Sequence, residues 1–150
     1  MEIRKMRAED SGGVYSLMCE SLDSYFAPSV VEYFLMQWPG GQIVAADSAG
    51  TPIGYIAGSR LFDSRVSVAL FCVKREYRKR GIGSAMLERF RQAAAMDGAR
   101  TIQLEVRETN SEAMGFYRRR GFMPTERLEN FYEDGGAGIR MVSGVFGSGN

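Results

Sequence analysis

YRKRGIGSAM (residues 77–86) sets basic side chains beside Gly81 and Gly83, shortly after the apolar run SVALFCV (67–73). A strand, a basic glycine-rich turn and a helix start together form an anion site, because successive backbone N–H groups and a helix N-terminus favour negative charge. The two glycines let the backbone approach an anion and adopt angles that other residues resist. The stretch is consistent with a nucleic-acid patch, a nucleotide P-loop or another anion cradle, and equally with a solvated basic loop capped by glycine.

The rest of the sequence argues against two of these anion sites. The P-loop pattern GxxxxGK[ST] is absent because Gly83 is followed by Ser84 and Ala85, and the dinucleotide pattern GxGxxG is incomplete. A nucleic-acid patch needs basic residues interleaved with exposed aromatics, whereas the net charge of the chain is only +1. An anion cradle of another kind and a solvated loop are the interpretations that stand.

Composition bounds the class of protein. The chain has 150 residues, of which 45% are hydrophobic and 25% are charged, as in one ordinary soluble domain. We expect a single domain over residues 1–150 whose last few residues form a loose tail. The run VALFCV (68–73) is far shorter than a membrane helix of about 20 residues, and the charged start MEIRKMRAED lacks the apolar core of a signal peptide. Direct contact with nucleic acid or with a membrane is not expected.

Histidine and cysteine usage narrows the chemistry. The chain has no histidine, which excludes His-based triads and most zinc sites, so no metal is expected. Cys19 and Cys72 lie in apolar surroundings without a CxxC partner, and we interpret both as reduced core residues. Reduced thiols of this kind are typical of a cytoplasmic protein.

Hydrophobic periodicity predicts one mixed α/β layer in which short strands and helices are interleaved. Strands are expected at 2–7, at 67–73 and at 101–107, and as hairpins over 42–60 and over 122–132 with 138–146. Helices are expected from an N-cap at Asp10 or Ser11 to Leu22, at 28–37, from Gly81 to Asp97, and after the cap signature TNSE (109–112).

Four separated blocks of the sequence resemble the GNAT acetyltransferase superfamily, in the same order along the chain. RKRGIG (78–83) is similar to its [RQ]-x-x-G-x-[GA] signature, and LEVRETNSEAMGFYRRRGF (104–122) and NFYEDGGAGIRM (130–141) resemble its later blocks. Residues 30–56 resemble the helix and hairpin of the protein N-terminal acetyltransferases, which include archaeal enzymes and bacterial ribosomal-protein alanine acetyltransferases. The resemblance implies a single-domain GNAT-like α/β fold. Its sheet is mixed and mostly antiparallel, with about seven strands, helices on both faces and a splayed central strand pair.

The resemblance also implies acetyl-CoA as cosubstrate, with the glycine loop around its pyrophosphate. The residues implied in coenzyme binding are Phe71, Cys72 and Val73 through their backbone, Arg78, Lys79, Arg80, Gly81, Ile82, Gly83 and Ser84 in the loop, and Asn110 and Tyr117. Each has a simpler interpretation, since 71–73 can be core, Asn110 can be a helix N-cap, and Arg118, Arg119 and Arg120 read as a solvated helix end.

Acetyl transfer to an amine needs a neutral amine and a protonated leaving thiolate. Glu105 faces away from Ile102, Leu104 and Val106 in its strand, and the resemblance implies that it accepts the amine proton, through water. The resemblance likewise implies that Tyr117 protonates the thiolate. Judged without the resemblance, Glu105 is a solvated or salt-bridged carboxylate and Tyr117 packs on a helix face.

The acceptor side is implied by the resemblance to N-terminal acetyltransferases. Phe26, Pro28 and Val30, between the first two helices, and Tyr132, in the last hairpin, would flank a peptide entrance. Some family members carry an acidic residue directly after this proline, where this chain has Ser29, which leaves the first-residue preference open. The predicted function is acetyl transfer to protein N-termini, with possible contact to a ribosome or an auxiliary subunit. The alternatives are an acetyltransferase of small amines and a non-catalytic CoA-binding domain.

Overall fold

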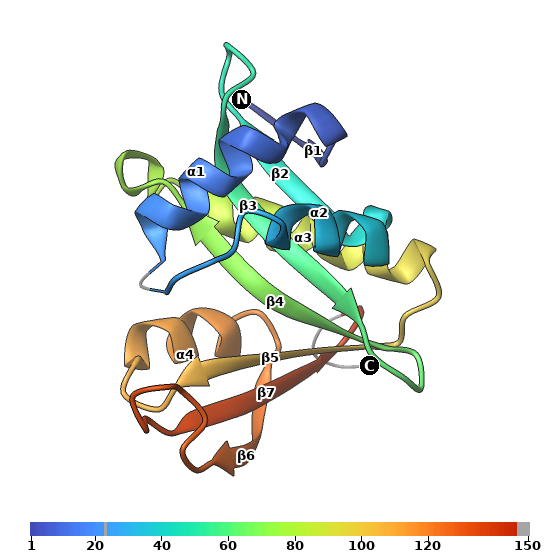
Figure 1. The fold of residues 1–150 in the computed structure, drawn as a ribbon. Helices are drawn as coiled ribbons and strands as arrows, with labels where there is room; N and C mark the ends of the chain where they lie inside the picture. Colours follow the sequence, from blue (N-terminus) through green and yellow to red (C-terminus); the bar gives the residue numbers. More distant parts are fainter. Residues whose placement is uncertain (23, 147–150) are drawn as a thin grey trace.

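The structure is a computed structural model that describes residues 1–22 and 24–146, so the tail expected at the last few residues lies outside the described part. One seven-stranded sheet has the order β1-β2-β3-β4-β5-β7-β6 (Figure 1). The strands are β1 (Glu2–Lys5), β2 (Gln42–Ala46), β3 (Pro52–Arg60), β4 (Arg65–Val73), β5 (Thr101–Arg107), β6 (Met123–Leu128) and β7 (Gly138–Gly144). Neighbouring strands are antiparallel except β4 and β5, which are parallel, so the predicted mixed sheet is confirmed.

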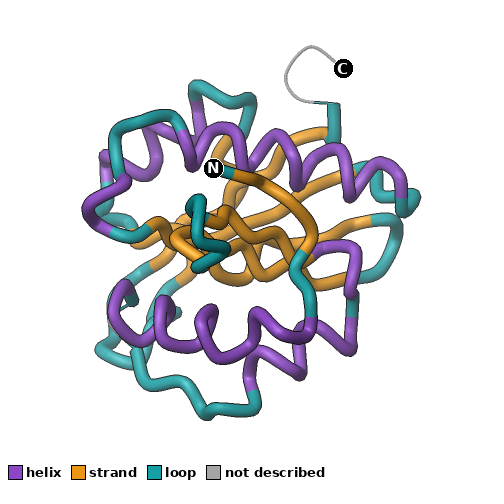
Figure 2. The backbone as a smooth tube through the Cα atoms, turned by 90° about the horizontal axis from the view of Figure 1, so that it is seen from above, coloured by secondary structure: helices purple, strands orange, loops and turns teal. Residues whose placement is uncertain are grey.

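Helices cover both faces of the sheet, as Figure 2 shows. They are α1 (Ser11–Ser21), α2 (Val30–Gln37), α3 (Ile82–Met96) and α4 (Ser111–Arg118). On one face, Met86 and Phe90 of α3 pack with Ile102 of β5, and α4 joins the same cluster. On the other face, Leu17 of α1 packs in a cluster with Tyr55 of β3. Among the described helices, none has the length and apolar character needed to cross a membrane.

A bulge in β4 explains why this strand is apolar on both faces. The register of β3 against β4 shifts between Ala57 and Gly58, which leaves Ala69 as the extra residue of β4. Because side chains alternate along a strand, the extra residue exchanges the two faces. Val68 before the bulge and Phe71 after it therefore both belong to the cluster under α3.

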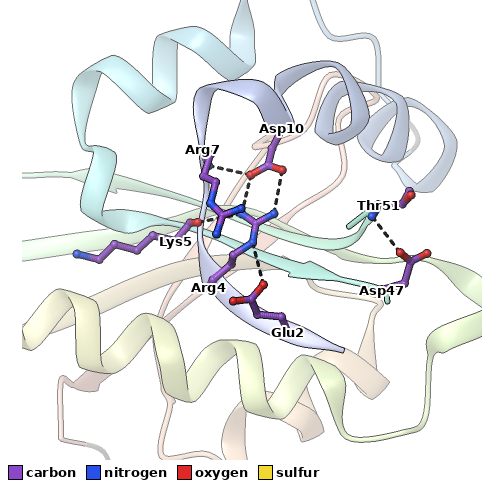
Figure 3. A network of polar contacts seen from close by, with 7 residues as sticks. All are labelled: Glu2, Arg4, Lys5, Arg7, Asp10, Asp47 and Thr51. Atoms are coloured by element: carbon purple, nitrogen blue, oxygen red, sulfur yellow. Dashed lines mark hydrogen bonds and ion pairs between the residues drawn. The ribbon is translucent and has the colours of Figure 1, made fainter. Parts of the chain in front are cut away.

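The start of α1 differs from the expectation, since neither Asp10 nor Ser11 caps the helix with its side chain. A short 3-10 helix, Ala8–Asp10, precedes α1 and turns the Asp10 carboxylate back toward β1. There it accepts hydrogen bonds from the Arg4 guanidinium at 2.7 and 3.0 Å and from the Arg7 N–H at 2.8 Å (Figure 3). Asp10 thus ties the first strand to the first helix.

The cysteine interpretation is right for one residue and wrong for the other. Cys72 is buried, whereas Cys19 is exposed. The apolar stripe of α1 consists of Val14, Leu17 and Met18, and it is this stripe that faces the sheet. Cys19 is one residue further round the helix and so points to solvent.

Candidate active site

The site begins where the central strands β4 and β5 separate. Their parallel pairing covers Arg65–Thr101, Val66–Ile102 and Ser67–Gln103, and no later pair is formed between the described residues of the two strands. Beyond these pairs the strands diverge, as the ribbon shows (Figure 1). The predicted splayed pair is confirmed, and the second half of β4 has a free main-chain edge.

That free edge presents the main chain of alternate residues. The Lys74 N–H donates to the Ile53 carbonyl at 2.8 Å, so residue 74 directs its main-chain groups toward β3. Alternation along the strand then directs the groups of Val73 and Phe71 toward the opening, and those of Cys72 toward β3. In agreement, the Val73 carbonyl accepts a hydrogen bond from Arg78 Nε at 2.8 Å.

The glycine loop after β4 has the geometry of an anion cradle. Lys79 and Gly81 both have left-handed backbones, with φ of 63° and 80°. The first main-chain bond of α3 runs from the Ala85 N–H to the Gly81 carbonyl at 3.1 Å. The N–H groups of residues 79–84 donate to no other described residue, so they are free to bind an anion.

The two glycines of this loop differ in what they provide. Gly81 needs its left-handed angle, which L side chains adopt only with strain. Gly83 lies inside α3 with ordinary helical angles, so the expectation of an unusual backbone is wrong for it. A Cβ at Gly83 would lie 3.6 Å from the Phe71 ring and 3.8 Å from the Phe116 ring, on the floor of a groove. Gly83 therefore provides space.

This groove, of about 630 Å³, joins the loop to the opening between the strands. It is lined by Phe71, Cys72 and Val73 of β4, by Arg78, Lys79, Gly81, Gly83 and Ser84, and by Asn110, Phe116, Tyr117, Arg119 and Arg120 of the α4 region. Ten of the residues predicted from the sequence to bind a coenzyme are thus brought to one groove, while Arg80 and Ile82 are not among its lining residues.

Arg120 is a groove residue that the sequence interpretation missed. It was expected in a solvated helix end, but it is half-buried, with its guanidinium 3.7 Å from the centre of the Phe116 ring. Its Nε donates to Ser84 Oγ at 3.1 Å, at the edge of the glycine loop. Burial and the neighbouring Arg119 lower the pKa of Arg120. It pairs with no carboxylate of the described residues, so it is a partly desolvated cation beside the free N–H groups.

Asn110 and Tyr117 enter the groove from α4. The Asn110 side chain caps the helix by accepting from the Ala113 N–H at 3.0 Å, so its predicted structural role is confirmed. Tyr117 packs edge-on between the rings of Phe116 and Phe122. Burial raises the pKa of Tyr117 above its ordinary value, which keeps the hydroxyl protonated.

Glu105 lies on the opposite face of β5 from Tyr117. Its neighbours Leu104 and Val106 belong to the cluster under α3, which Tyr117 also joins, so Glu105 points to the other face. The side chain is only 19% exposed and accepts hydrogen bonds from Gln103 Nε2 and Arg140 Nε, each at 2.9 Å. Tyr117 lines the groove, whereas Glu105 is not among its lining residues and lies on the other face of β5, beyond the last pair that β5 forms with β4.

The predicted acceptor residues come from two elements. Phe26 and Val30 pack against the α1 cluster, with Pro28 exposed between them. Tyr132 lies in the β6–β7 connection, where the Arg107 guanidinium stacks 4.2 Å from its ring centre. Burial raises the pKa of Tyr132, the positive charge of Arg107 opposes that rise, and the negative charge of Glu105 adds to it. In the ribbon, the two elements lie on either side of the splay (Figure 1).

The whole region from α1 to the end of α4 matches a known family. Residues 12–122 match the acetyltransferase (GNAT) family. This chain is a member of the GNAT acetyltransferase family.

Two relatives of this GNAT protein match over most of their own length. An uncharacterized N-acetyltransferase of Methanocaldococcus jannaschii is 32% identical over 143 residues, 95% of this chain and 90% of the relative. N-alpha-acetyltransferase 30 of Schizosaccharomyces pombe is 30% identical, over 86% of this chain and 88% of the relative. The crystal structure of Ard1 from Thermoplasma volcanium superposes with a TM-score of 0.88 at 30% identity, and covers 95% of this chain and 96% of its own.

The described residues give little support for a covalent mechanism through a cysteine or for a metal-dependent one. Burial raises the pKa of the Cys72 thiol to about 12, so it is a poor nucleophile at neutral pH. Within residues 1–22 and 24–146, no group of three or more acidic or cysteine side chains is placed to hold a metal ion.

Proposed function

We propose that this GNAT protein transfers an acetyl group from acetyl-CoA directly to the α-amino group of a protein N-terminus. The observation that carries the proposal is the continuous groove from the free N–H groups of residues 79–84 to the splay between β4 and β5. A groove of this kind suits a long ligand that has phosphates at one end and amide groups along its length. A protein N-terminus is the acceptor because one relative that spans most of the chain is an N-alpha-acetyltransferase.

The donor set fits acetyl-CoA. The N–H groups of residues 79–84 and the Arg120 guanidinium favour phosphate oxygens. The main-chain groups of Phe71 and Val73 offer strand-like hydrogen bonds to the amides of a pantetheine arm. When bound, acetyl-CoA supplies the thioester whose acetyl group is transferred.

Two side chains supply the proton transfers. Glu105 accepts a proton from the acceptor amine through water, which makes the amine nucleophilic. Tyr117 donates a hydrogen bond, and finally a proton, to the leaving sulfur, because burial keeps its hydroxyl protonated. No covalent enzyme intermediate is required, since the Cys72 thiol is buried and protonated.

The acceptor enters between the α1–α2 connection and the β6–β7 connection. Phe26 and Val30 offer an apolar surface for a small or apolar first residue, and Tyr132 closes the other side. An α-amine, with a pKa of about 8, is far easier to deprotonate than a lysine with a pKa of about 10.4. We place this activity in the cytoplasm, where nascent chains are available, with a ribosome or an auxiliary subunit as the docking partner.

The test is a thiol-release assay with acetyl-CoA, using peptides varied at residues 1 and 2 beside a panel of polyamines, amino acids and aminoglycosides. We expect peptides with an apolar or small first residue to react fastest and internal lysines to react poorly. Tyr132→Ala should raise the peptide KM while coenzyme affinity is unchanged, with Phe62→Ala, which removes an exposed ring between β3 and β4, as the control. If a free amine reacts faster than every peptide, the acceptor is a small amine and not a protein N-terminus. If no acceptor is acetylated at all, the protein is a coenzyme-binding domain without catalytic activity.

A further inference from the structure

A row of polar side chains crosses four neighbouring strands on the face that carries Glu105. Arg65 of β4 donates to Gln103 Oε1 at 2.9 Å, and Gln103 Nε2 donates to Glu105. From the other side, Arg140 of β7 donates to Glu105 through Nε and to Glu126 of β6 through Nη1, the latter at 3.2 Å. The row places one carboxylate, Glu105, between two side chains that both donate to it.

Both donors meet the same oxygen of Glu105. Gln103 Nε2 and Arg140 Nε each lie 2.9 Å from Oε2, whereas Oε1 accepts a hydrogen bond from no described residue. The orientation of the Gln103 amide is settled by Arg65, because a guanidinium only donates and so must face the amide oxygen. The Gln103 amino group is thereby directed at Glu105.

The register of the sheet fixes Arg140 opposite Glu105. Arg140 is the direct cross-strand partner of Glu105 and of Glu126, so all three side chains leave the sheet on one face. The Arg140 side chain is 28% exposed and that of Glu105 19%, so water screens their contact only in part. An ion pair of this sort is ordinarily structural, but the free second oxygen sets it apart.

We propose that Arg140 is a positioning residue: together with Gln103 it holds Glu105 by Oε2 and presents Oε1 as the oxygen that accepts the proton. The inference rests on the proposed role of Glu105 as base. A general base works only when its accepting atom is within hydrogen-bond reach of the proton, directly or through one water. A carboxylate free to rotate would spend part of its time with neither oxygen in that place.

The test compares kcat, peptide KM and coenzyme Kd for Arg140→Met and Arg140→Lys. Methionine keeps an unbranched chain in the sheet but cannot donate, so we expect kcat to fall about 10- to 100-fold, as for a small misplacement of a catalytic group. Peptide KM and coenzyme Kd should change less than about 3-fold. Lysine restores a cationic donor and should recover most of the loss. Glu126→Gln is the matched control, because it removes the charge of the other carboxylate that pairs with Arg140 and should leave kcat unchanged.

Two further variants separate this inference from the function on which it rests. In a Glu105→Gln background, Arg140→Met should cause no additional loss of kcat, because Arg140 acts only through Glu105. Gln103→Met removes the second donor and should lower kcat independently, which serves if Arg140→Met does not fold. Parental kcat in a folded Arg140→Met protein, beside a strong loss in Glu105→Gln, would overturn the inference and leave the base intact. Parental kcat in Glu105→Gln itself would overturn both.

Discussion

Tyr117 is the residue whose environment bears most directly on chemistry. Its ring lies between Phe116 and Phe122, and burial raises its pKa above the value of about 10 that an exposed tyrosine has. A thiolate released into the same groove is desolvated as well, which raises the pKa of its conjugate thiol above the ordinary value of about 8.5. The two shifts act in parallel, so the tyrosine can still pass its proton to the sulfur.

Replacing Tyr117 by phenylalanine keeps the ring and removes only the donor. We expect kcat to fall by about 100- to 10,000-fold, the range typical of a general acid, with little change in coenzyme Kd. Steady-state thiol release and coenzyme titration measure the two quantities. Tyr77→Phe, which removes another hydroxyl from the lining of the groove, is the control. Turnover of Tyr117→Phe within about 3-fold of the parent would show that another group protonates the sulfur.

Arg120 is the second residue whose role emerges at this scale. Its partly desolvated charge lacks a carboxylate partner among the described residues and lies beside Ser84, so a coenzyme phosphate should compensate it. A hydrogen bond to a charged group contributes about 1.5–3 kcal/mol, so Arg120→Gln should weaken acetyl-CoA binding roughly 10- to 100-fold. Calorimetric titration checks this, with the exposed Arg118→Gln as the control.

The same pair of proteins identifies the phosphate. If Arg120 contacts the pyrophosphate, Arg120→Gln weakens acetyl-CoA and its 3′-dephospho analogue equally. If it contacts the 3′-phosphate, only the binding of acetyl-CoA suffers. Unchanged affinity for both ligands would leave Arg120 as a structural link between α4 and α3.

At the scale of elements, the start of α3 combines two kinds of glycine. Gly81 makes the left-handed turn that directs the N–H groups of the loop outward, whereas Gly83 keeps the floor of the groove open. The helix itself tolerates a side chain at position 83, since its angles are ordinary there. Fold and ligand binding can therefore be separated at this one position.

We expect Gly83→Val to fold and to raise the dissociation constant of acetyl-CoA strongly, because its methyl groups project into the groove beside Phe71 and Phe116. Gly83→Ala, whose Cβ fits at ordinary contact distance, should have a much smaller effect. Circular dichroism reports the fold. Binding is measured by the increase that acetyl-CoA causes in the free energy of unfolding. For the parent this increase should be about 2.7 kcal/mol when the acetyl-CoA concentration is a hundred times Kd. If acetyl-CoA stabilises the parent, Gly83→Val and Gly83→Ala equally, the groove is not where the coenzyme binds.

At the scale of the whole molecule, the Arg4–Asp10 pair fastens the first strand to the first helix (Figure 3). The hydrogen bonds that Arg4 donates to the Asp10 carboxylate are the main cause of its lowered pKa, and the hydrogen bond from the Arg7 N–H lowers it further. A carboxylate whose pKa is lowered by folding stabilises the native state above its unfolded pKa, near 3.9. That stabilisation is lost as the pH falls through the lower pKa of the folded state.

Asp10→Asn should therefore reduce the free energy of unfolding at pH 7 by roughly 3 kcal/mol, the cost of breaking a buried ion pair. The difference from the parent should begin to shrink below about pH 4, where the unfolded carboxyl takes up a proton, and should disappear once the pH is below the lowered pKa of the folded state. Urea unfolding at pH 7 and near pH 3 measures both values. Glu9→Gln, an exposed neighbour, controls for net charge. A constant difference between the two pH values would mean that Asp10 acts by packing and not by its charge.

The sequence by itself determined the features that depend on neighbours along the chain. Apolar spacing within a few residues predicts the strands and the amphipathic helices, and the glycine loop with its N–H groups lies within eight consecutive residues. Asn110 caps α4 because the N–H group it accepts from is three residues away. The four family blocks then predicted the splay, because that feature belongs to the fold they identify.

Only the tertiary structure decided which distant side chains meet. Arg140 reaches Glu105 because β7 is inserted between β5 and β6, an order that no local pattern encodes. Arg120 leaves the expected solvated helix end because the start of α3 lies against the end of α4 and offers Ser84. Asp10 does not cap α1 for the same kind of reason. Arg4 of β1 binds the Asp10 carboxylate more strongly than the helix N–H groups would.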